Sequence, residues 1–239
     1  ILDRPMELNI WRAPTDNDRK IKLEWMDAHY DQSYVRAYET SYQAEESKVT
    51  IFTHMAVVAA TVQKVLDIHA VWEVTSDGAV SVKMNTVKDR FGLRLFLKDN
   101  FKDVTYYGIG PDESYVDKCR SGSHGVYTSK VEDLHEDYLR PQENGSHTDC
   151  DYVCVSSDKL TLSAAGEKTI AFNASEYTQE ELTNKKHGYE LEKCGSTVLC
   201  IDYSQNGIGS NSCGPVLSEK YQLNEEKFTF DVKLVLHNR

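Results

Sequence analysis

The feature that most constrains the fold of this chain is an alternation of apolar and polar side chains with a period of two. Residues 66–74 place an apolar side chain at almost every second position, and the pattern returns at 49–55, 80–84, 91–97 and 228–236. Successive side chains of a β-strand point to opposite faces, so each segment predicts a half-buried strand. Together these segments predict antiparallel sheets with one covered face.

Turn and helix signals are few and short. Residues 76–78 (Ser-Asp-Gly) separate two alternating segments and predict a hairpin. Helical spacing is limited to residues 21–28, after Asp18, and to a brief helix that the pair Thr178 and Glu181 would open as a capping box. With no linker and no internal repeat, the 239 residues predict one all-β domain, too large for a single flat sheet and most simply a sandwich.

Charge and composition exclude several classes of partner. The chain has 38 acidic and 27 basic residues, a net charge of −11, which argues against nucleic acid, since the phosphate backbone requires a basic face. No apolar run approaches the roughly 18 residues of a membrane span, so no membrane partner is expected. The chain opens Ile-Leu-Asp-Arg, without an initiator Met or a signal peptide, which predicts a piece cut from a longer protein. The compartment therefore stays open between the cytoplasm and the periplasm of a bacterium.

The six cysteines predict neither disulfides nor a metal site. None belongs to a C-x-x-C pair, and a chain of this size needs no covalent staples. Cys200 lies in an apolar run and is expected to pack as a small hydrophobic residue; most of the others are expected to be free, buried thiols. Cys150 and Cys154 lie near His147, but a structural zinc site requires four ligands at characteristic spacing.

Three segments break the alternation and predict long irregular loops, where binding chemistry tends to be found. They are residues 12–18, residues 106–125 with a continuation at 140–145, and residues 207–215. In the first segment, Arg12 offers a planar donor fork to carboxylates. Together with Asp16 and Asp18, Arg12 has the donors and acceptors to bind sugar hydroxyls. The alternative is a self-bracing turn in which Asn17 caps the following residues.

The acids of the second segment do not predict a catalytic pair. Asp112 and Glu113 are neighbours, and in extended chain they point to opposite faces. Glu143 is a second candidate partner, but a glycosidase needs two carboxyls roughly 5–10 Å apart, a distance that sequence does not fix. Structural roles are the simpler prediction.

The histidines of the same region, and the tyrosines of the whole chain, fit more than one role. His124, His135 and His147 are able to act as acids or bases near neutral pH, but they are predicted to be solvated loop residues. The 14 tyrosines suit sugar stacking, strands and interfaces alike.

The loop segments together resemble the C-terminal, small-chain domain of glycoside hydrolase family 2 β-galactosidases. Residues 107–115 resemble the aromatic-G-x-G-P-x-E-N-Y stretch of that family, and 131–145 continue in the same order. Residues 12–18 match the R-A-P-x-D-N-D segment, and 209–215, followed by Tyr-Gln-Leu at 221–223, are similar to its closing motif. The resemblance covers nearly the whole chain.

The resemblance implies a fold and a role for residues 1–239. The fold is a large antiparallel supersandwich related to galactose mutarotases. The family hydrolyses terminal non-reducing β-D-galactosides with retention, using two glutamates of a separate (β/α)₈ barrel. No eight-fold βα pattern occurs here, so no catalytic residue is assigned and the isolated chain is expected to be inactive.

The implied partners are a β-galactoside, the catalytic barrel of the same polypeptide or of a partner subunit, and further copies of the whole enzyme. No cofactor is expected within these residues, and a requirement for Mg²⁺ or Na⁺ would belong to the whole enzyme. This domain would complete a wall of the sugar pocket with five substrate-binding residues: Asp16, Asn17, Asp18, Asn211 and Cys213.

The sequence departs from the family pattern at three places. Cys213 stands where well-known members carry an aromatic ring that stacks on sugar. Arg19-Lys20 replaces a stretch that commonly includes a glycine, which puts a mobile lid in doubt. Ser114 replaces the Asn of Glu-Asn-Tyr.

Two other functions stay open at this point. One is a non-catalytic carbohydrate-binding or assembly module. The other is a mutarotase-like enzyme acting on free galactose, suggested by fold analogy alone, which would require a histidine and a carboxylate in one concave site.

Overall fold

A computed structural model describes residues 1–60, 62–86, 90–209, 215–223 and 227–239. Within these ranges the chain is almost entirely β-structure. The strands are β1 (Leu2–Asn9), β2 (Tyr34–Ala44), β3 (Lys48–Ala59), β4 (Val62–Thr75), β5 (Ala79–Thr86), β6 (Arg90–Lys98), β7 (Asp103–Gly110), β8 (Ser123–Lys130), β9 (Ser146–Ser156), β10 (Leu160–Ser175), β11 (Ser196–Gln205) and β12 (Phe228–Asn238). The α-helices are α1 (Ile21–Asp27) and α2 (Gln179–Asn184). Neither has the length and apolar character required to cross a membrane, nor does any other helix in the described ranges.

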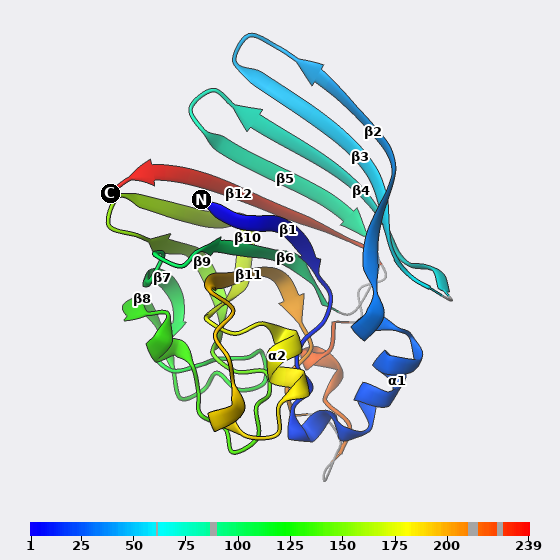
Figure 1. Cartoon of the computed structure of the whole chain (residues 1–239), viewed down its shortest axis with the longest axis vertical. Helices are drawn as coiled ribbons and strands as arrows, with labels where there is room; N and C mark the ends of the chain where they lie inside the picture. The colour runs from blue at the N-terminus through cyan, green and yellow to red at the C-terminus, as the bar shows by residue number, and fades with distance from the viewer. Residues whose placement is uncertain (61, 87–89, 210–214, 224–226) are drawn as a thin grey trace.

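The strands form a single curved sheet in which the described ladders are antiparallel (Figure 1). The main order is β1-β6-β11-β10-β12-β5-β4-β3-β2, and β7 and β8 join it through β9. The predicted all-β antiparallel fold is confirmed.

Strand β10 is the junction of this sheet. Its first half, Leu160–Gly166, pairs with β12, and its second half, Ala171–Ser175, pairs with β11, while β9 pairs along both halves. The ladder with β9 shifts register between Ala165 and Ile170, and such irregularities increase local twist. Three limbs therefore diverge from β10: the β1 limb (β11, β6, β1), the β2 limb (β12, β5, β4, β3, β2) and the β8 limb (β9, β7, β8).

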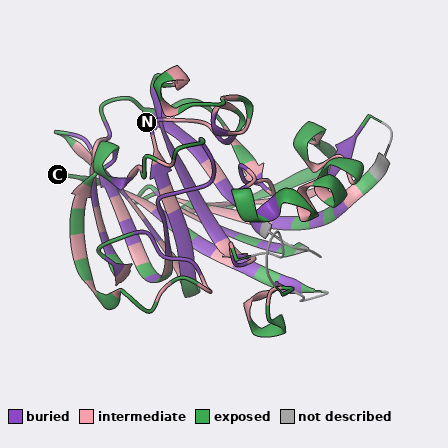
Figure 2. Cartoon of the chain, turned by 90° about the horizontal axis from the view of Figure 1, so that it is seen from below, coloured by how far each residue is buried: buried purple, intermediate pink, exposed green. Residues whose placement is uncertain are grey.

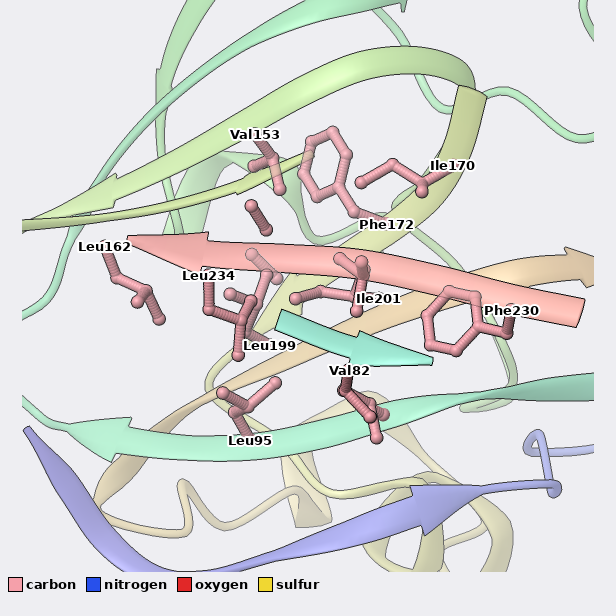
Figure 3. Close-up of a cluster of buried hydrophobic side chains, with 14 of the residues drawn as sticks. Val82, Leu95, Val153, Leu162, Ile170, Phe172, Leu199, Ile201, Phe230 and Leu234 are labelled. Carbon is pink, nitrogen blue, oxygen red and sulfur yellow. The ribbon is translucent and has the colours of Figure 1, made fainter. Parts of the chain in front are cut away.

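The core lies where the three limbs curve toward one another. Figure 3 shows Val82, Leu95 and Val153, one from each limb, converging with Phe172 of β10. In β6 the alternating residues predicted to be apolar are at most 3% exposed: Phe91, Leu93, Leu95 and Leu97. Burial of each such side chain contributes about 1.5–3 kcal/mol, so the alternation that predicts the strands also supplies much of the stabilisation.

The short turn and helix signals are confirmed. Gly78 adopts φ +85° in the turn between β4 and β5, where the Asp77 carboxylate accepts from the backbone N–H of Ala79 at 3.3 Å. Helix α1 covers the stretch predicted after Asp18. Helix α2 begins after Thr178, whose hydroxyl oxygen accepts from the Glu181 N–H at 3.1 Å.

The prediction of an irregular loop over residues 106–125 is wrong at both ends. Tyr106–Gly110 belongs to β7 and pairs with β8, which begins at Ser123. Glycines conceal these strands in the sequence because they interrupt the apolar alternation. Their role is close approach: a Cβ atom on Gly108 would lie 2.3 Å from Sγ of Cys150 on β9.

The predicted solvated state of His147 is also wrong. This residue is on β9 and 1% exposed, with its ring stacked on Phe172 at 5.1 Å and beside Tyr106 at 4.5 Å. Cys150 and Cys200 are buried free thiols, as expected. The other described cysteines are free but only partly buried: Cys119, Cys154 and Cys194.

Candidate functional site

The loops at the end of the molecule opposite the β2–β3 hairpin form one connected site (Figure 1). This loop end comprises residues 11–18, 113–118, 138–145 and 206–209, which hydrogen bonds join to one another. It contains most of the described segments that carry the family resemblance.

The Arg12 side chain connects the first segment to the closing segment. Its Nη2 donates to Asp18 Oδ1 at 2.7 Å, and its Nη1 donates to the carbonyl of Asn206 at 3.0 Å. The guanidinium also lies over the ring of Trp25 on α1, 5.3 Å from its centroid. Arg12 and Asp18 are 5% and 0% exposed, so this ion pair is fully inside the protein.

The Asp18 carboxylate also braces its own loop. Its Oδ2 accepts from the N–H of Thr15 at 2.8 Å and from the Thr15 hydroxyl at 3.0 Å. The neighbouring Asp16 N–H donates to Oε1 of Gln142 at 2.9 Å. The first segment is therefore the self-bracing turn considered in the sequence, and it is also fixed to the second segment.

Asp16 and Asn17 are exposed between these braces. Asp16 lines a cavity of about 470 Å³ together with Trp11 and Arg140. The predicted binding residues of this segment thus separate into two exposed side chains and one, Asp18, that is buried. All three stay predictions as ligands of a sugar.

The closing segment is held at its start by Asp117. The carboxylate of Asp117 accepts from the N–H groups of Ile208 at 2.9 Å and Gly209 at 2.7 Å. The other predicted binding residues, Asn211 and Cys213, lie outside the described residues. Sequence reasoning missed Asp117, because nothing in the spacing of residues 117 and 208 indicates that they meet.

Glu113 is buried and accepts hydrogen bonds from three other residues of the loop end. It is 7% exposed, whereas its neighbour Asp112 is exposed, as expected for residues that face opposite ways. Glu113 Oε1 accepts from Lys118 Nζ at 2.5 Å and from the Tyr138 hydroxyl, and Oε2 accepts from the Gly145 N–H at 2.7 Å. Burial alone lowers the pKa of Lys118, but its hydrogen bonds to Glu113 and Tyr138 raise that pKa above its ordinary value. This cluster joins the two halves of the second segment.

The histidines of the region do not converge on one site. Burial lowers the pKa of both His147 and His135 below the ordinary value, because it disfavours the charged imidazolium. His124 is on β8, where its Nε2 lies 3.0 Å from the carbonyl of Asp149.

A second cavity, of about 730 Å³, lies on the β2 limb beside the irregular part of β10. Asp67 and His69 of β4 line it, together with Asn85, Glu167 and Tyr203. A histidine and a carboxylate therefore share one cavity wall, far in sequence from the family motifs.

The comparison with protein families agrees with the resemblance seen in the loops. Residues 1–234 match the family described as beta galactosidase small chain. The chain belongs to this family. A β-galactosidase of Actinobacillus pleuropneumoniae is 43% identical over 242 residues, which include 98% of this chain and 24% of that protein. A β-galactosidase of Staphylococcus xylosus is 38% identical over 95% of this chain and 24% of that protein.

The small-chain family member described here thus spans about a quarter of the length of these curated relatives. Their shared name does not favour the alternatives of a separate binding module or a mutarotase-like enzyme. Among solved structures, the galactose 1-epimerase of Lactobacillus acidophilus has a TM-score of 0.43 and 10% identity, over 84% of this chain and 66% of that one. A likeness of that strength carries no inference about function.

Proposed function

We propose that this chain is part of a glycoside hydrolase family 2 β-galactosidase that releases terminal non-reducing β-D-galactose, and that it forms one wall of the sugar pocket. The observation that carries the proposal is the family match over residues 1–234. In this proposal the catalytic glutamates belong to the rest of the enzyme, because the chain spans about a quarter of its relatives.

The cavity beside Asp16 supports the role of a pocket wall. Sugar sites combine a few fixed polar groups with an aromatic face, and this cavity has the Asp16 carboxylate, the Arg140 guanidinium and the Trp11 ring. The braced loop that carries Asp16 is ordered before any ligand arrives, which reduces the entropy lost on binding.

Strand β2 supports the packing of this chain against the rest of the enzyme. It is the last strand of the sheet order, and all of its 11 residues are exposed. The exposed side chains include large apolar ones: Tyr34, Val35, Tyr38 and Tyr42. Soluble proteins normally cover or charge such edges, so we assign β2 to an interface with the catalytic barrel or with another copy of the enzyme.

The test measures hydrolysis of a chromogenic β-galactoside by the complete enzyme and its variants. Loss of one hydrogen bond to substrate should cost about 0.5–1.5 kcal/mol, so Asp16→Ala and Asn17→Ala should raise KM roughly 2- to 13-fold. Since the bond is made to substrate and transition state alike, kcat should change little. Asp27→Ala, an exposed acid of α1 that does not line the cavity, is the matched control.

Two results would contradict the proposal. Unchanged KM values in both variants would remove the first segment from the sugar pocket. Turnover by the 239-residue chain alone, above the level of contamination, would place the catalytic acids within this chain.

A further inference from the structure

Three metal-ligating side chains gather on the face of the β2 limb that points away from the core. His54 of β3 lies directly opposite His69 of β4 in the antiparallel ladder. Asp67 lies two residues before His69 and shares its face, because side chains alternate along a strand. The neighbouring residues Met55 and Ile68 point into the core and fix this orientation.

The three side chains are already in contact. The rings of His54 and His69 are stacked, with centroids 4.4 Å apart and planes at 4°. Nε2 of His54 lies 2.9 Å from Oδ1 of Asp67. One ligand atom from each residue can be chosen so that all lie within 4.8 Å of one another.

These separations are close to those of a filled coordination sphere. Tetrahedral zinc, with bonds of about 2.1 Å, holds its ligand atoms about 3.4 Å apart. The ladder places His54 opposite His69, with Asp67 two residues before His69 on the same face, so the remaining adjustment falls to side-chain rotation about χ1 and χ2.

We propose that His54, Asp67 and His69 form a binding site for a divalent transition metal ion of the zinc type. Two imidazoles and one carboxylate match the ligand preference of such ions, whereas Mg²⁺ and Ca²⁺ prefer oxygen ligands. Three protein ligands leave a further coordination position for water. This site differs from the sequence-based expectation of no metal in the chain, because ligands on two strands meet only through the register of the sheet.

Access to the site is open. The side chains of His54 and Asp67 are 30% and 47% exposed. Asp67 also accepts from Lys64 Nζ at 3.1 Å, and the ring of Tyr38 lies 5.4 Å from that of His54. Exposed ion pairs are weak, so a metal ion can displace the Lys64 ammonium, which is 48% exposed and also lies 5.5 Å from the ring centroid of Tyr38.

The position of the site suggests what the metal would do. It would join β3 to β4 beside the exposed strand β2, and so stabilise the pairing of these two strands. Because Asp67 and His69 also line the cavity of about 730 Å³, the ion would lie at the rim of that cavity.

The experiment uses the protein as the cell makes it, stripped with a chelator and titrated with Zn²⁺ alone. Bound zinc is measured by elemental analysis, and Co²⁺ absorption reports the ligand field. Loss of an outer-shell partner typically weakens metal binding about 10- to 100-fold. His54→Gln and His69→Gln each remove a direct ligand, so each should lower the affinity for one zinc equivalent by at least that factor. Zinc should also raise the Tm of the wild type more than that of either variant.

Two further variants separate specific zinc binding at this site from binding elsewhere. His124→Gln is the matched control, because His124 pairs with the Asp151 carboxylate at 3.5 Å but belongs to no three-ligand group among the described residues, and it should leave the zinc equivalent unchanged. Lys64→Gln removes the competing cation and should tighten zinc binding. Equal zinc content and affinity in the wild type, His54→Gln and His69→Gln would overturn the proposal, as would an equal loss in His124→Gln.

Discussion

The loop end and the β2 limb use the same kinds of side chain in opposite ways. At the loop end an ion pair is internal: Arg12 and Asp18 are 5% and 0% exposed. On the β2 limb the pair of Lys48 and Glu73 is 32% and 44% exposed. Figure 2 shows buried residues concentrated along the central strands and largely exposed residues on the short helices. Charge thus fixes geometry at one end and keeps the other end solvated.

The tyrosine side chains show the converse. The β2 limb leaves Tyr38 and Tyr42 46% and 72% exposed, whereas the loop end buries Tyr115 to 1%. A rigid, polar loop end suits recognition of a small polar ligand, and an exposed apolar edge suits a macromolecular interface. The two ends are therefore suited to separate tasks, and substitutions can test this division.

The largest effect is expected from breaking the buried pair. Arg12→Ala leaves the Asp18 carboxylate buried without its guanidinium, which typically costs about 3–5 kcal/mol of unfolding free energy. Urea unfolding followed by circular dichroism measures this loss. A loss below about 1 kcal/mol would mean that the pair resembles an exposed one, and the contrast between the two ends would fail.

The next largest effect compares two glycines with positive φ. A Cβ atom on Gly145, at φ +69°, would lie 2.3 Å from the carbonyl oxygen of Leu134. Gly78, at φ +85° in the β4–β5 turn, has nothing within 4 Å. Gly78→Ala should therefore cost only the backbone strain of about 1–2 kcal/mol, and Gly145→Ala should cost more. Equal midpoints for the two variants in thermal unfolding would contradict this.

A smaller and more local effect is expected on β2. Tyr42→Ser should leave the stability of the chain within about 0.5 kcal/mol, because the side chain is 72% exposed. In the complete enzyme it should weaken assembly by about 1–2 kcal/mol if Tyr42 is an interface anchor. Analytical ultracentrifugation and activity at decreasing concentration measure assembly. If Tyr42→Ser, Tyr34→Ser and Tyr38→Ser all assemble as the wild type does, the assignment of β2 to an interface is wrong.

The smallest effect is expected from Glu73→Gln. The hydrogen bond and the charge of Glu73 raise the pKa of Lys48 above its ordinary value. A raised lysine pKa means that any stabilisation is present at neutral pH and is lost only as pH rises through the folded-state pKa. The variant should unfold at the wild-type urea midpoint at pH 7, and a clear shift there would show that exposed charges stabilise the β2 limb.

The sequence predicts the strands where packing alone decides them. In β6, alternation from Phe91 to Leu97 is sufficient, because one face is buried and the other is not. Apolar alternation does not predict β7 and β8. In β7, residue 108 is a glycine because Cys150 of β9 lies too close to leave room for a Cβ atom. The neighbouring strand β9 therefore determines the residue type at position 108, and the alternation within β7 does not reveal it.

The sites are predictable to a different extent. Asp16 and Asn17 are predicted as binding residues from a local motif, which the sequence displays directly, and they stay predictions. Asp117 meets Ile208, and His54 meets His69, only after distant segments or strands are brought into register. Contacts of that kind depend on topology, which residue spacing does not encode.

The shared strand β10 has a consequence for how the molecule opens. Because β9, β11 and β12 all hydrogen-bond to β10, none of the three limbs can separate without exposing the hydrogen-bonding groups of β10. Local opening should therefore begin at the terminal strands β1, β2 and β8 and stop before β10. Amide hydrogens of Leu162, Ala164 and Phe172 should be among the last to exchange, since only global unfolding releases them.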